Sequence, residues 1–463
     1  MTITEALRGV LGEAQVITEP AVLAERRHDY WMVSHLRDRQ GAAAPSPACV
    51  VRPRSVADVQ TTLRLANERR VAVIPFGLGS GVVGGVIASP DAIVLDLSSM
   101  NAVRSIDPVN LLASFDAGKN GAEAEAAVAE QGLTIGHWPQ SIAVSSVGGW
   151  IATRASGQFS TAYGNIEDIV HSIEAVLPTG ELVILGKGPR ASAGPDLRHL
   201  MMGSEGTLGV ITGVTLSLRR QPEARALSAF EAADMRAGFA LQREIIQRGW
   251  RPPVMRQNDV RESGRLDARL TKCVILMVHE GPAALVEAEA AAVAALAAEM
   301  GVPTAPVDVV EHWLGHRNTV TPWDAILSRN MVADTVEISG AWDTIGDIYD
   351  DAVAALKAIP GCIAASAHSS HVYRSGLNLY FTFAILPPDP ADMEAAYFQA
   401  WKAIIEATSR HGGGVAHHHG IGRVRRDYLT LDLGPDGVEL LRKVKRALDP
   451  NGIMNPGVLI PDA

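Results

Sequence analysis

Tyr380 and three consecutive histidines near the C-terminus combine side chains that can move protons. Tyr380 lies in an apolar stretch, and His417, His418 and His419 stand in a later loop bounded by glycines. Histidine titrates near pH 7 without perturbation, whereas a tyrosine, with an ordinary pKa near ~10, needs a nearby cation to act as a base. Together they could remove a hydroxyl proton while a hydride leaves for a redox cofactor. Considered alone, these residues also fit a core tyrosine and a solvated loop.

Glycine-rich turns in the N-terminal half are suited to holding a phosphate-bearing cofactor. Glycine adopts positive φ without strain and lets successive backbone N–H groups close around a pyrophosphate. The spacing differs from both the GxGxxG fingerprint and the P-loop, and a single turn of this kind fits an ordinary loop equally well. The first turn comprises Pro75, Phe76, Gly77, Leu78, Gly79, Ser80 and Gly81.

Related turns recur further along the chain. Glycine and small hydroxyl residues pack closely and offer hydrogen bonds, so their recurrence favours one shared polar cofactor over separate loops. The candidates in the second stretch are Gln140, Ser141, Ser145, Ser146, Gly149, Thr153, Arg154, Ala155 and Ser156. Those in the third stretch are Glu205, Gly206, Thr207, Gly209, Val210 and Ile211.

The order of these motifs resembles a known family. The letters PFGLGSG, SSVGGWIATRASG, YGNIEDIV and MGSEGTLGVIT follow one another between residues 75 and 212. They resemble the FAD-binding PCMH-type domain of the vanillyl-alcohol oxidase superfamily, which includes D-lactate and glycolate dehydrogenases. The resemblance covers residues 46 to 220 and implies FAD as the cofactor.

This resemblance assigns each turn a part in holding FAD. Residues 75–81 and 140–146 would hold the pyrophosphate and ribityl regions. Residues 153–156 and 205–211 would line the remaining flavin and adenine contacts. Some relatives attach the flavin through a histidine in the first turn. Because Gly79-Ser80-Gly81 contains no histidine, we expect non-covalent FAD.

A resemblance to the alkyldihydroxyacetone-phosphate synthases, a non-redox branch of the superfamily, extends over nearly the whole chain. It is carried by residues 188–212 and, near the C-terminus, by HVYRSGLNLYF from His371 and HHHGIGR from His417. It implies that Tyr380 is an acid/base residue and that the histidines at 417–419 assist it.

One departure from the synthases concerns the substrate. They carry an arginine for the substrate phosphate in a PYLRD-like segment, but residues 321–327 read TPWDAIL. Losing such a charge-assisted clamp would cost on the order of 2 kcal/mol of binding. We therefore expect a more aromatic, less anionic pocket, with candidate substrate contacts from Arg317, Trp323, Arg329 and Arg374.

The metal-binding pattern of many 2-hydroxy-acid dehydrogenases in the superfamily is also altered. Tyr380 stands where the second histidine of their HxGDGNxH-like segment belongs. The acid that precedes a histidine in those enzymes is replaced too, since residues 416–419 read AHHH. No catalytic metal is expected.

Three functions are compatible with these observations. The first is an FAD-dependent dehydrogenase or oxidase that takes hydride from a small alcohol or 2-hydroxy acid. In it Tyr380 is the base, aided by His418 or a neighbouring histidine, and the electron acceptor (oxygen, a quinone or a cytochrome) is left open. The second is a synthase-like transferase that replaces an acyl group by an alkoxy group without net redox. The third is a flavoprotein without activity of its own.

An α+β architecture is expected to position these groups. It would contain an N-terminal helical segment (1–45), a two-subdomain FAD-binding PCMH-type domain (46–222), a cap domain with an antiparallel sheet and flanking helices (223–412), and a C-terminal segment that returns to the flavin site (413–463).

Local signals place several elements within these segments. Ser55 and Asp58 form a capping box for a helix that runs to about residue 69, and Thr179-Gly180 joins a hairpin. Residues 377–386 read as a buried strand and residues 391–410 as a helix. Residues 282–301 form a helix whose predicted buried face carries Leu285, Val293, Leu296 and Met300.

Composition argues against several classes of protein. The 463 residues include 47% apolar side chains, enough for a large core, and a net charge of −10 gives no general attraction to nucleic acids. There is no run of eighteen apolar residues and no signal-peptide pattern at the N-terminus. Three scattered cysteines indicate a reducing compartment. We expect a cytoplasmic enzyme of a small-molecule substrate, without a membrane span; a homodimer is allowed but not indicated.

Overall fold

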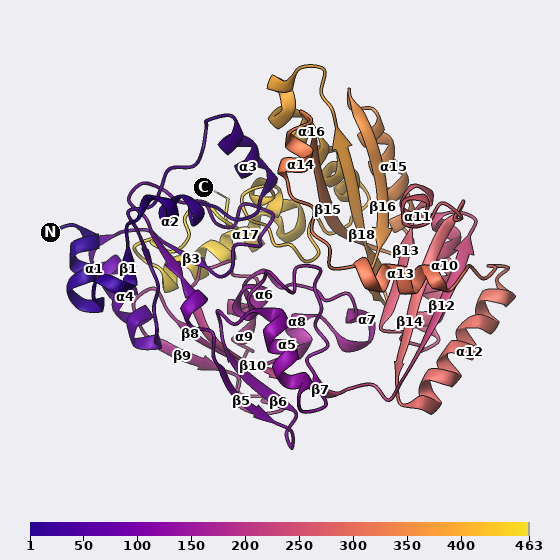
Figure 1. Cartoon of the computed structure of the whole chain (residues 1–463), viewed down its shortest axis with the longest axis horizontal. Coiled ribbons are helices and arrows are strands. Elements are labelled where there is room, and N and C mark those ends of the chain that lie inside the picture. The colour runs from indigo at the N-terminus through magenta and orange to yellow at the C-terminus, as the bar shows by residue number, and fades with distance from the viewer. Residues whose placement is uncertain (462–463) are drawn as a thin grey trace.

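The computed structural model describes residues 1 to 461 and begins with a four-stranded sheet of order β1-β2-β4-β3 (Figure 1). β2 and β3 run parallel to the central β4. The predicted capping box of α4 is confirmed, because Ser55 and Asp58 bond each other's backbone N–H groups. The strands are β1 (Val16–Ile17), β2 (Cys49–Val51), β3 (Val73–Phe76) and β4 (Ile93–Asp96), and the helices are α1 (Ile3–Leu11), α2 (Pro20–Glu25), α3 (Met32–Arg39) and α4 (Val56–Arg69).

A five-stranded antiparallel sheet of order β5-β6-β10-β8-β9 follows. The predicted hairpin is confirmed, because β8 pairs with β9 across Thr179-Gly180. The strands are β5 (Val103–Asp107), β6 (Leu112–Asp116), β8 (Val170–Val176), β9 (Leu182–Leu185) and β10 (Val210–Ser217), beside a short pair, β7 (Leu133–Thr134) and β11 (Arg219–Arg220). The helices are α5 (Gly121–Ala129), α6 (Val147–Thr153), α7 (Ser160–Tyr163), α8 (Ile166–Ile169) and α9 (Arg198–Met201).

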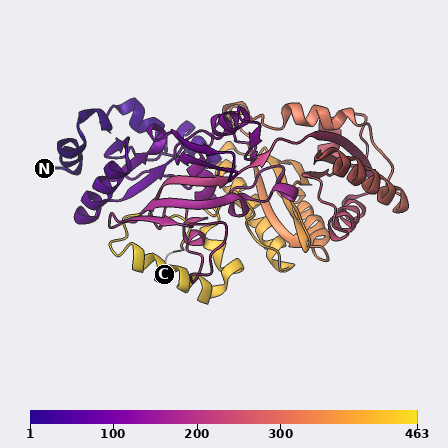
Figure 2. The ribbon, with the colours of Figure 1, turned by 90° about the horizontal axis from the view of Figure 1, so that it is seen from below.

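The next region forms one large antiparallel sheet of order β12-β14-β13-β16-β18-β15, with β17 paired to β18. In two perpendicular views this sheet lies beside the first two (Figure 1 and Figure 2). An antiparallel sheet with flanking helices, as predicted for the cap, is confirmed. The strands are β12 (Ala224–Ala232), β13 (Val254–Asn258), β14 (Cys273–Gly281), β15 (Val332–Ala341), β16 (Cys362–Ser369), β17 (Val372–Tyr373) and β18 (Gly376–Ile385). The helices are α10 (Met235–Gln247), α11 (Val260–Leu266), α12 (Ala283–Glu299), α13 (Asp308–His316), α14 (Asp324–Leu327), α15 (Ile345–Lys357) and α16 (Met393–Arg410).

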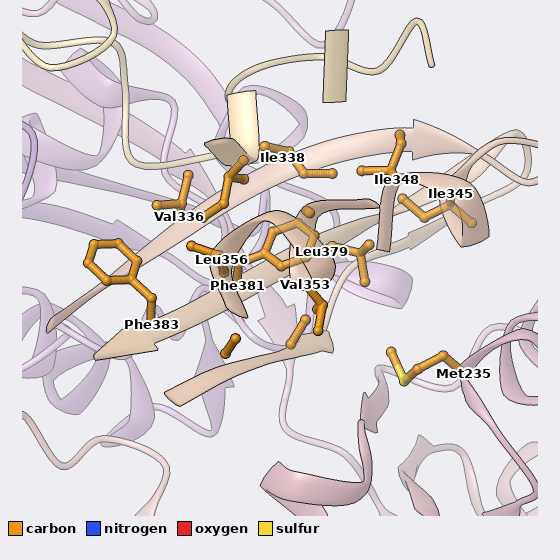
Figure 3. Packing of buried hydrophobic residues seen from close by; sticks show 14 of the residues in the cluster. Met235, Val336, Ile338, Ile345, Ile348, Val353, Leu356, Leu379, Phe381 and Phe383 are labelled. Carbon is orange, nitrogen blue, oxygen red and sulfur yellow. The ribbon is translucent and has the colours of Figure 1, made fainter. Parts of the chain in front are cut away.

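The two faces of the large sheet differ in chemistry because side chains alternate along each strand. On one face, Val336 and Phe381 belong to a buried apolar cluster that includes residues of α15 (Figure 3). The opposite face carries Tyr380, which pairs in register with Glu337 on β15 and with His368 on β16. We call this second surface, defined by Glu337, His368 and Tyr380, the polar face.

The buried face of helix α12 differs from the predicted one. Val293 and Leu296 are buried as predicted, and Met300 packs partly buried against the core. Leu285, however, is 53% exposed, so its predicted place on the buried face was wrong. The buried stripe passes through residue 286, and one residue along a helix turns the side chain by about 100°. None of the helices within residues 1–461 has the length and hydropathy that crossing a bilayer requires.

The C-terminal segment returns from the large sheet to the first sheet. Gly414 exchanges backbone hydrogen bonds with Ser339 of β15, and the Asn455 N–H donates to the carbonyl of Val73. Between these contacts lies α17 (Leu429–Leu448).

Two buried carboxylates tie distant segments to one glycine-rich turn. Glu205 accepts the N–H groups of Ile421 and Gly422 at 2.7 and 2.8 Å. Asp29 accepts the N–H of Gly85 at 2.7 Å. A Cβ placed on Gly85 would lie 3.7 Å from the Asp29 carboxylate and 3.9 Å from that of Glu205, so both acids meet the same turn. Burial raises the pKa of Asp29 to about 7 and the pKa of Glu205 to about 7.

The orientation of helix α12 can be tested with two leucines of that helix. Leu296→Ala should lower the free energy of unfolding by about 2–5 kcal/mol, because it leaves a cavity in the core. Leu285→Ala should change it by less than about 0.5 kcal/mol, because the side chain is exposed. Denaturant unfolding followed by circular dichroism measures both, and equal destabilisation by the two changes would contradict the observed orientation.

The buried carboxylates predict how stability depends on pH. Their folded pKa values lie above the unfolded ones, so their stabilising contribution is present at acid pH and is lost as the pH rises through about 7. Each shift is worth on the order of 3 kcal/mol at full ionisation. The free energy of unfolding should therefore fall as the pH rises from about 4 to about 7 and level off above that.

Urea unfolding of the flavin-bound protein at constant ionic strength measures this slope. Glu205→Gln or Asp29→Asn should flatten it, while Glu287→Gln on the exposed side of α12 should leave it unchanged. A wild-type profile without a slope would show that the two acids are not buried as observed.

Candidate active site

Tyr380 projects from β18 onto the polar face of the large sheet. Its ring stacks on that of His368, with ring centroids 4.7 Å apart, and its hydroxyl accepts a hydrogen bond from Thr335 Oγ1 at 2.9 Å. His368 is held in turn by Glu262, with Nδ1 2.7 Å from Oε2. Because Thr335, Tyr380 and His368 come from three neighbouring strands, the sheet positions the phenol from both sides.

His419 connects Tyr380 to a buried ion pair. Its Nε2 lies 3.5 Å from Tyr380 Oη, at the outer limit of a hydrogen bond, and its Nδ1 lies 2.8 Å from Glu337 Oε2. The backbone N–H groups of His418 and His419 also donate to Glu337, and Arg425 donates to both carboxylate oxygens. Glu337 and Arg425 were not predicted from the sequence, because neither belongs to a motif. The pairing of β15 with β18 is what brings Glu337 beside Tyr380.

Electrostatics set the protonation states of this group. Burial alone would raise the pKa of Glu337, but Arg425 and His419 hold it well below its ordinary value, so Glu337 is a carboxylate. Burial raises the pKa of Tyr380, and the charge of Glu337 raises it further. Tyr380 is therefore a phenol at neutral pH. A phenol can accept a proton only if it gives up its own, and His419 Nε2 is the histidine nitrogen within 3.5 Å of its hydroxyl. The predicted role of Tyr380 as a base assisted by a histidine stays a prediction.

A second tyrosine–histidine pair lies beside the first and was not predicted. Tyr373 Oη is 2.7 Å from His417 Nε2, and Asn165 Nδ2 donates to the same hydroxyl at 3.2 Å. His417 Nδ1 is 2.8 Å from His418 Nδ1, so one ring donates and the other accepts. Burial lowers the pKa of His417 to about 4 and that of His418 well below its ordinary value, which keeps both rings neutral at pH 7.

His371, His417 and His418 form the one group within residues 1–461 whose ligand atoms could share a metal ion. One nitrogen from each lies within 4.8 Å of the others, and neutral imidazole is the form that binds metals. However, ring nitrogens of His371 and His417 already face the hydroxyls of Ser160 and Tyr373, at 2.6 and 2.7 Å. Hydrogen bonds thus account for these two nitrogens, and the expected absence of a catalytic metal stays a prediction.

A cavity of about 610 Å³ lies between the N-terminal sheets and the large sheet. Its volume is in the range that small-molecule and cofactor sites occupy. Part of its wall is built from small residues at 339–341 and 412–414. The predicted site residues that line it are Thr153, Arg154, Ser156, Glu205 and His417, joined by Tyr373.

The first glycine-rich turn has the properties of a diphosphate cradle. The N–H groups of residues 78–84 have no acceptor among the residues that the structure describes. Gly79 has a φ of +72°, and a Cβ there would overlap the Phe76 ring. A Cβ on Gly77 would overlap Ser146 Oγ, so the first and second predicted turns touch. These free donors fit the pyrophosphate of FAD.

The other predicted cofactor residues surround these turns. Ser145 accepts an indole N–H, Ser146 caps α6, and the Thr207 hydroxyl bonds within its own turn. Val210 and Ile211 begin β10 and are buried in the core. In or next to the same turns lie Gln140, Ser141, Gly149, Ala155, Gly206 and Gly209.

The four predicted substrate residues are not gathered at the cavity. Arg317 packs over the Phe159 ring, 5.1 Å from its centroid, and Trp323 donates its indole N–H to the backbone of the N-terminal segment. Arg329 and Arg374 are exposed. None of the four lines the 610 Å³ cavity, and neither do Tyr380, His418 and His419, so the roles of all these residues stay predictions.

Two family models and several known proteins match the chain. The model described as FAD binding domain matches residues 47–186, and that of FAD linked oxidases, C-terminal domain, matches residues 221–459. YgcU of Escherichia coli O157:H7, described as an uncharacterized FAD-linked oxidoreductase, is 33% identical over 99% of this chain and 98% of its own length. The alkyldihydroxyacetonephosphate synthase of Dictyostelium discoideum is 29% identical over 92% of this chain and 75% of its own.

A solved structure of an alkyldihydroxyacetonephosphate synthase shares the fold. It superposes with a TM-score of 0.81 over 98% of this chain and 84% of its own, at 24% identity. The predicted turns at 75–81 and 140–156 lie within the first family match, and Tyr380 with the histidine loop lies within the second. The chain therefore belongs to the FAD-linked oxidase family and is an FAD-dependent oxidoreductase.

Proposed function

We propose that the enzyme oxidises a small alcohol or 2-hydroxy acid and that Tyr380 and His419 remove the hydroxyl proton. The observation that carries this proposal is the continuous set of contacts from Tyr380 through His419 to the Glu337–Arg425 pair. FAD, when bound, supplies the acceptor for the hydride of the carbinol carbon. The side chains bind the substrate, orient its hydroxyl and take the proton.

The proton moves from the substrate hydroxyl to Tyr380 Oη, while Tyr380 gives its own proton to His419 Nε2. Thr335 already donates to Tyr380 Oη, so the phenol can accept a hydrogen bond while its own proton is directed to His419. A neutral His419 with its proton on Nδ1 faces Glu337 and keeps a free lone pair on Nε2. Once protonated, the imidazolium lies against the Glu337 carboxylate, which stabilises it.

Among the three histidines of the loop, the surroundings favour His419 as the proton acceptor. His417 and His418 bond each other, and burial lowers the pKa of His417 to about 4. His419 instead contacts a carboxylate that is ionised and held by Arg425. A proton placed on His419 would therefore lie beside a negative charge, which attracts it.

A synthase-like transferase is the second candidate. The similarity to the Dictyostelium synthase, together with the triple-histidine loop, favours it. Such an enzyme would exchange the acyl group of an acyl-dihydroxyacetone phosphate for an alkoxy group without net reduction of the flavin. The missing arginine at residues 321–327 counts against it, because a substrate phosphate needs a charge-assisted clamp.

Flavin absorbance separates the two candidates. Anaerobic addition of a panel of 2-hydroxy acids and small alcohols should bleach the yellow protein with at least one substrate, because hydride transfer reduces the flavin. A transferase would keep its absorbance and would exchange a labelled fatty alcohol into acyl-dihydroxyacetone phosphate. No bleaching with the whole panel, together with measurable exchange, would replace the first function by the second.

Tyr380→Phe should slow this bleaching by about 10²- to 10⁴-fold, because the hydroxyl that takes the proton is lost while the ring is kept. Stopped-flow absorbance with the best substrate measures the rate, and the visible spectrum checks that flavin stays bound. Tyr349→Phe is the matched control, since Tyr349 Oη contacts Asp259 and should not affect the rate. Unchanged bleaching by the Tyr380 variant would remove Tyr380 from the mechanism.

A further inference from the structure

Tyr373, His417 and His418 form a hydrogen-bonded series that the mechanism above does not use. Tyr373 Oη lies 2.7 Å from His417 Nε2, and His417 Nδ1 lies 2.8 Å from His418 Nδ1. The two ring nitrogens of His417 are therefore engaged on opposite sides, one by a phenol and one by an imidazole. A histidine held in this way can receive a proton at one nitrogen and release another from the other nitrogen.

The inner end of the series lies beside Tyr380. The His418 ring stacks on the Tyr380 ring, with centroids 5.9 Å apart and an interplanar angle of 20°. The His418 centroid is also 4.5 Å from that of His419. Within residues 1–461, His418 Nε2 has no hydrogen-bond partner, whereas Nδ1 faces His417. Nε2 is therefore the nitrogen through which the series can exchange a proton with the space around Tyr380.

The outer end of the series opens into the 610 Å³ cavity. Tyr373 and His417 line this cavity, whereas His418 does not. Asn165, which also lines it, donates Nδ2 to Tyr373 Oη at 3.2 Å, and its Oδ1 accepts the Ser156 hydroxyl at 2.7 Å. Because Ser156 fixes the amide, the Tyr373 oxygen is held in place while its own proton stays free to turn toward the cavity.

A proton that reaches His419 needs a route to water. The Glu337 carboxylate lies 2.8 Å from His419 Nδ1 and attracts such a proton. The His419 side chain is only 16% exposed and is not part of the cavity wall. The next turnover requires a neutral His419, so the proton has to leave. A hydrogen-bonded series that ends at a cavity provides a route without a large movement of the protein.

The resting charges of the series suit the passage of a proton. Burial lowers the pKa of His417 to about 4 and holds that of His418 well below its ordinary value. Burial also raises the pKa of Tyr373. All three groups are therefore neutral at pH 7, and none of them retains an extra proton once it has been passed on.

We propose that His418, His417 and Tyr373 carry the proton of the substrate hydroxyl from the active site to the 610 Å³ cavity. The inference rests on the proposed function and extends it to the step that follows proton removal. The proton leaves His419 and reaches His418 Nε2 through one water molecule.

Each member of the series then passes on its own proton. His418 gives the Nδ1 proton to His417 Nδ1, and His417 gives the Nε2 proton to Tyr373 Oη. Tyr373 gives its phenol proton to water in the cavity. One N–H or O–H bond forms for each one that breaks, and no electron is transferred in this step.

Stopped-flow measurement of proton release beside flavin bleaching tests the relay. In weak buffer with a pH-indicator dye, the best substrate of the bleaching panel should release one proton per flavin bleached, at the rate of bleaching. Tyr373→Phe keeps the ring and removes the hydroxyl, so it should slow release by about 10²-fold while the first bleaching changes little. Tyr428→Phe, a tyrosine outside the series, is the control. Release that keeps pace with bleaching in Tyr373→Phe, whether both are fast or both slow, would overturn the relay.

Chemical rescue tests the middle member of the series. His417→Gly should show the same delay, and added imidazole should remove it, because His417 lines the cavity and its loss leaves room for the small ring. 1-Methylimidazole, which has one nitrogen blocked, should not restore release. His411→Gly, which alters a histidine that contacts Asp351, is the matched control. Equal rescue by the two compounds, or no rescue by imidazole in a protein that keeps its yellow colour, would contradict the role of His417.

A measurement without turnover separates the relay from the proposed function. In flavin-bound protein labelled with ¹⁵N-histidine, the ring N–H protons of His417 and His418 should exchange with solvent more slowly after Tyr373→Phe. If no substrate bleaches the flavin but exchange depends on Tyr373, the proposed function falls and the proton path stands. Bleaching by a substrate, with exchange and release independent of Tyr373, would do the reverse. Activity that is lost on chelation and restored by Zn²⁺ would also overturn the relay, because a metal would occupy the histidine nitrogens.

Discussion

The buried ion pair between Glu337 and Arg425 is the interaction on which the arrangement of the histidine loop around Tyr380 depends. Glu337 belongs to the large sheet and Arg425 to the returning C-terminal segment, and both side chains are fully buried. Removing one partner of such a pair leaves an uncompensated charge, which typically costs about 3–5 kcal/mol. The same carboxylate accepts the backbone N–H groups of His418 and His419, so the pair also sets the conformation of the histidine loop.

Side chains alternate between the two faces of the large sheet, so one face packs into the apolar core and the other carries the polar side chains of the candidate site. Phe381 packs into the apolar core, while its neighbour Tyr380 faces Glu337, His368 and the histidine loop. Buried polar groups are costly unless they are hydrogen-bonded, and on the polar face most of them are.

The conformation of the glycine-rich turns depends on the side chains that pack against them as well as on their own sequence. Gly77 lies against Ser146, and the Gly85 turn rests near the carboxylates of Asp29 and Glu205. Glu205 also accepts the backbone N–H of Ile421, so one side chain contacts both the turn and the segment that follows the histidine loop. A single buried acid therefore joins the predicted cofactor turn to the segment that follows the histidine loop.

The sequence by itself determined the family, its FAD cofactor and the hairpin at Thr179-Gly180, and it singled out the glycine-rich turns, Tyr380 and the triple histidine as candidates. These are local signals: glycine allows a backbone to approach a phosphate, and a motif preserves the spacing of its side chains. Only the tertiary structure decided that His419 is the histidine that bridges Tyr380 to Glu337, and that Arg329 and Arg374 stay exposed. The reason is that strand register and the return of a distant segment depend on hydrogen bonds and packing between residues far apart in the chain, which no spacing along the chain records.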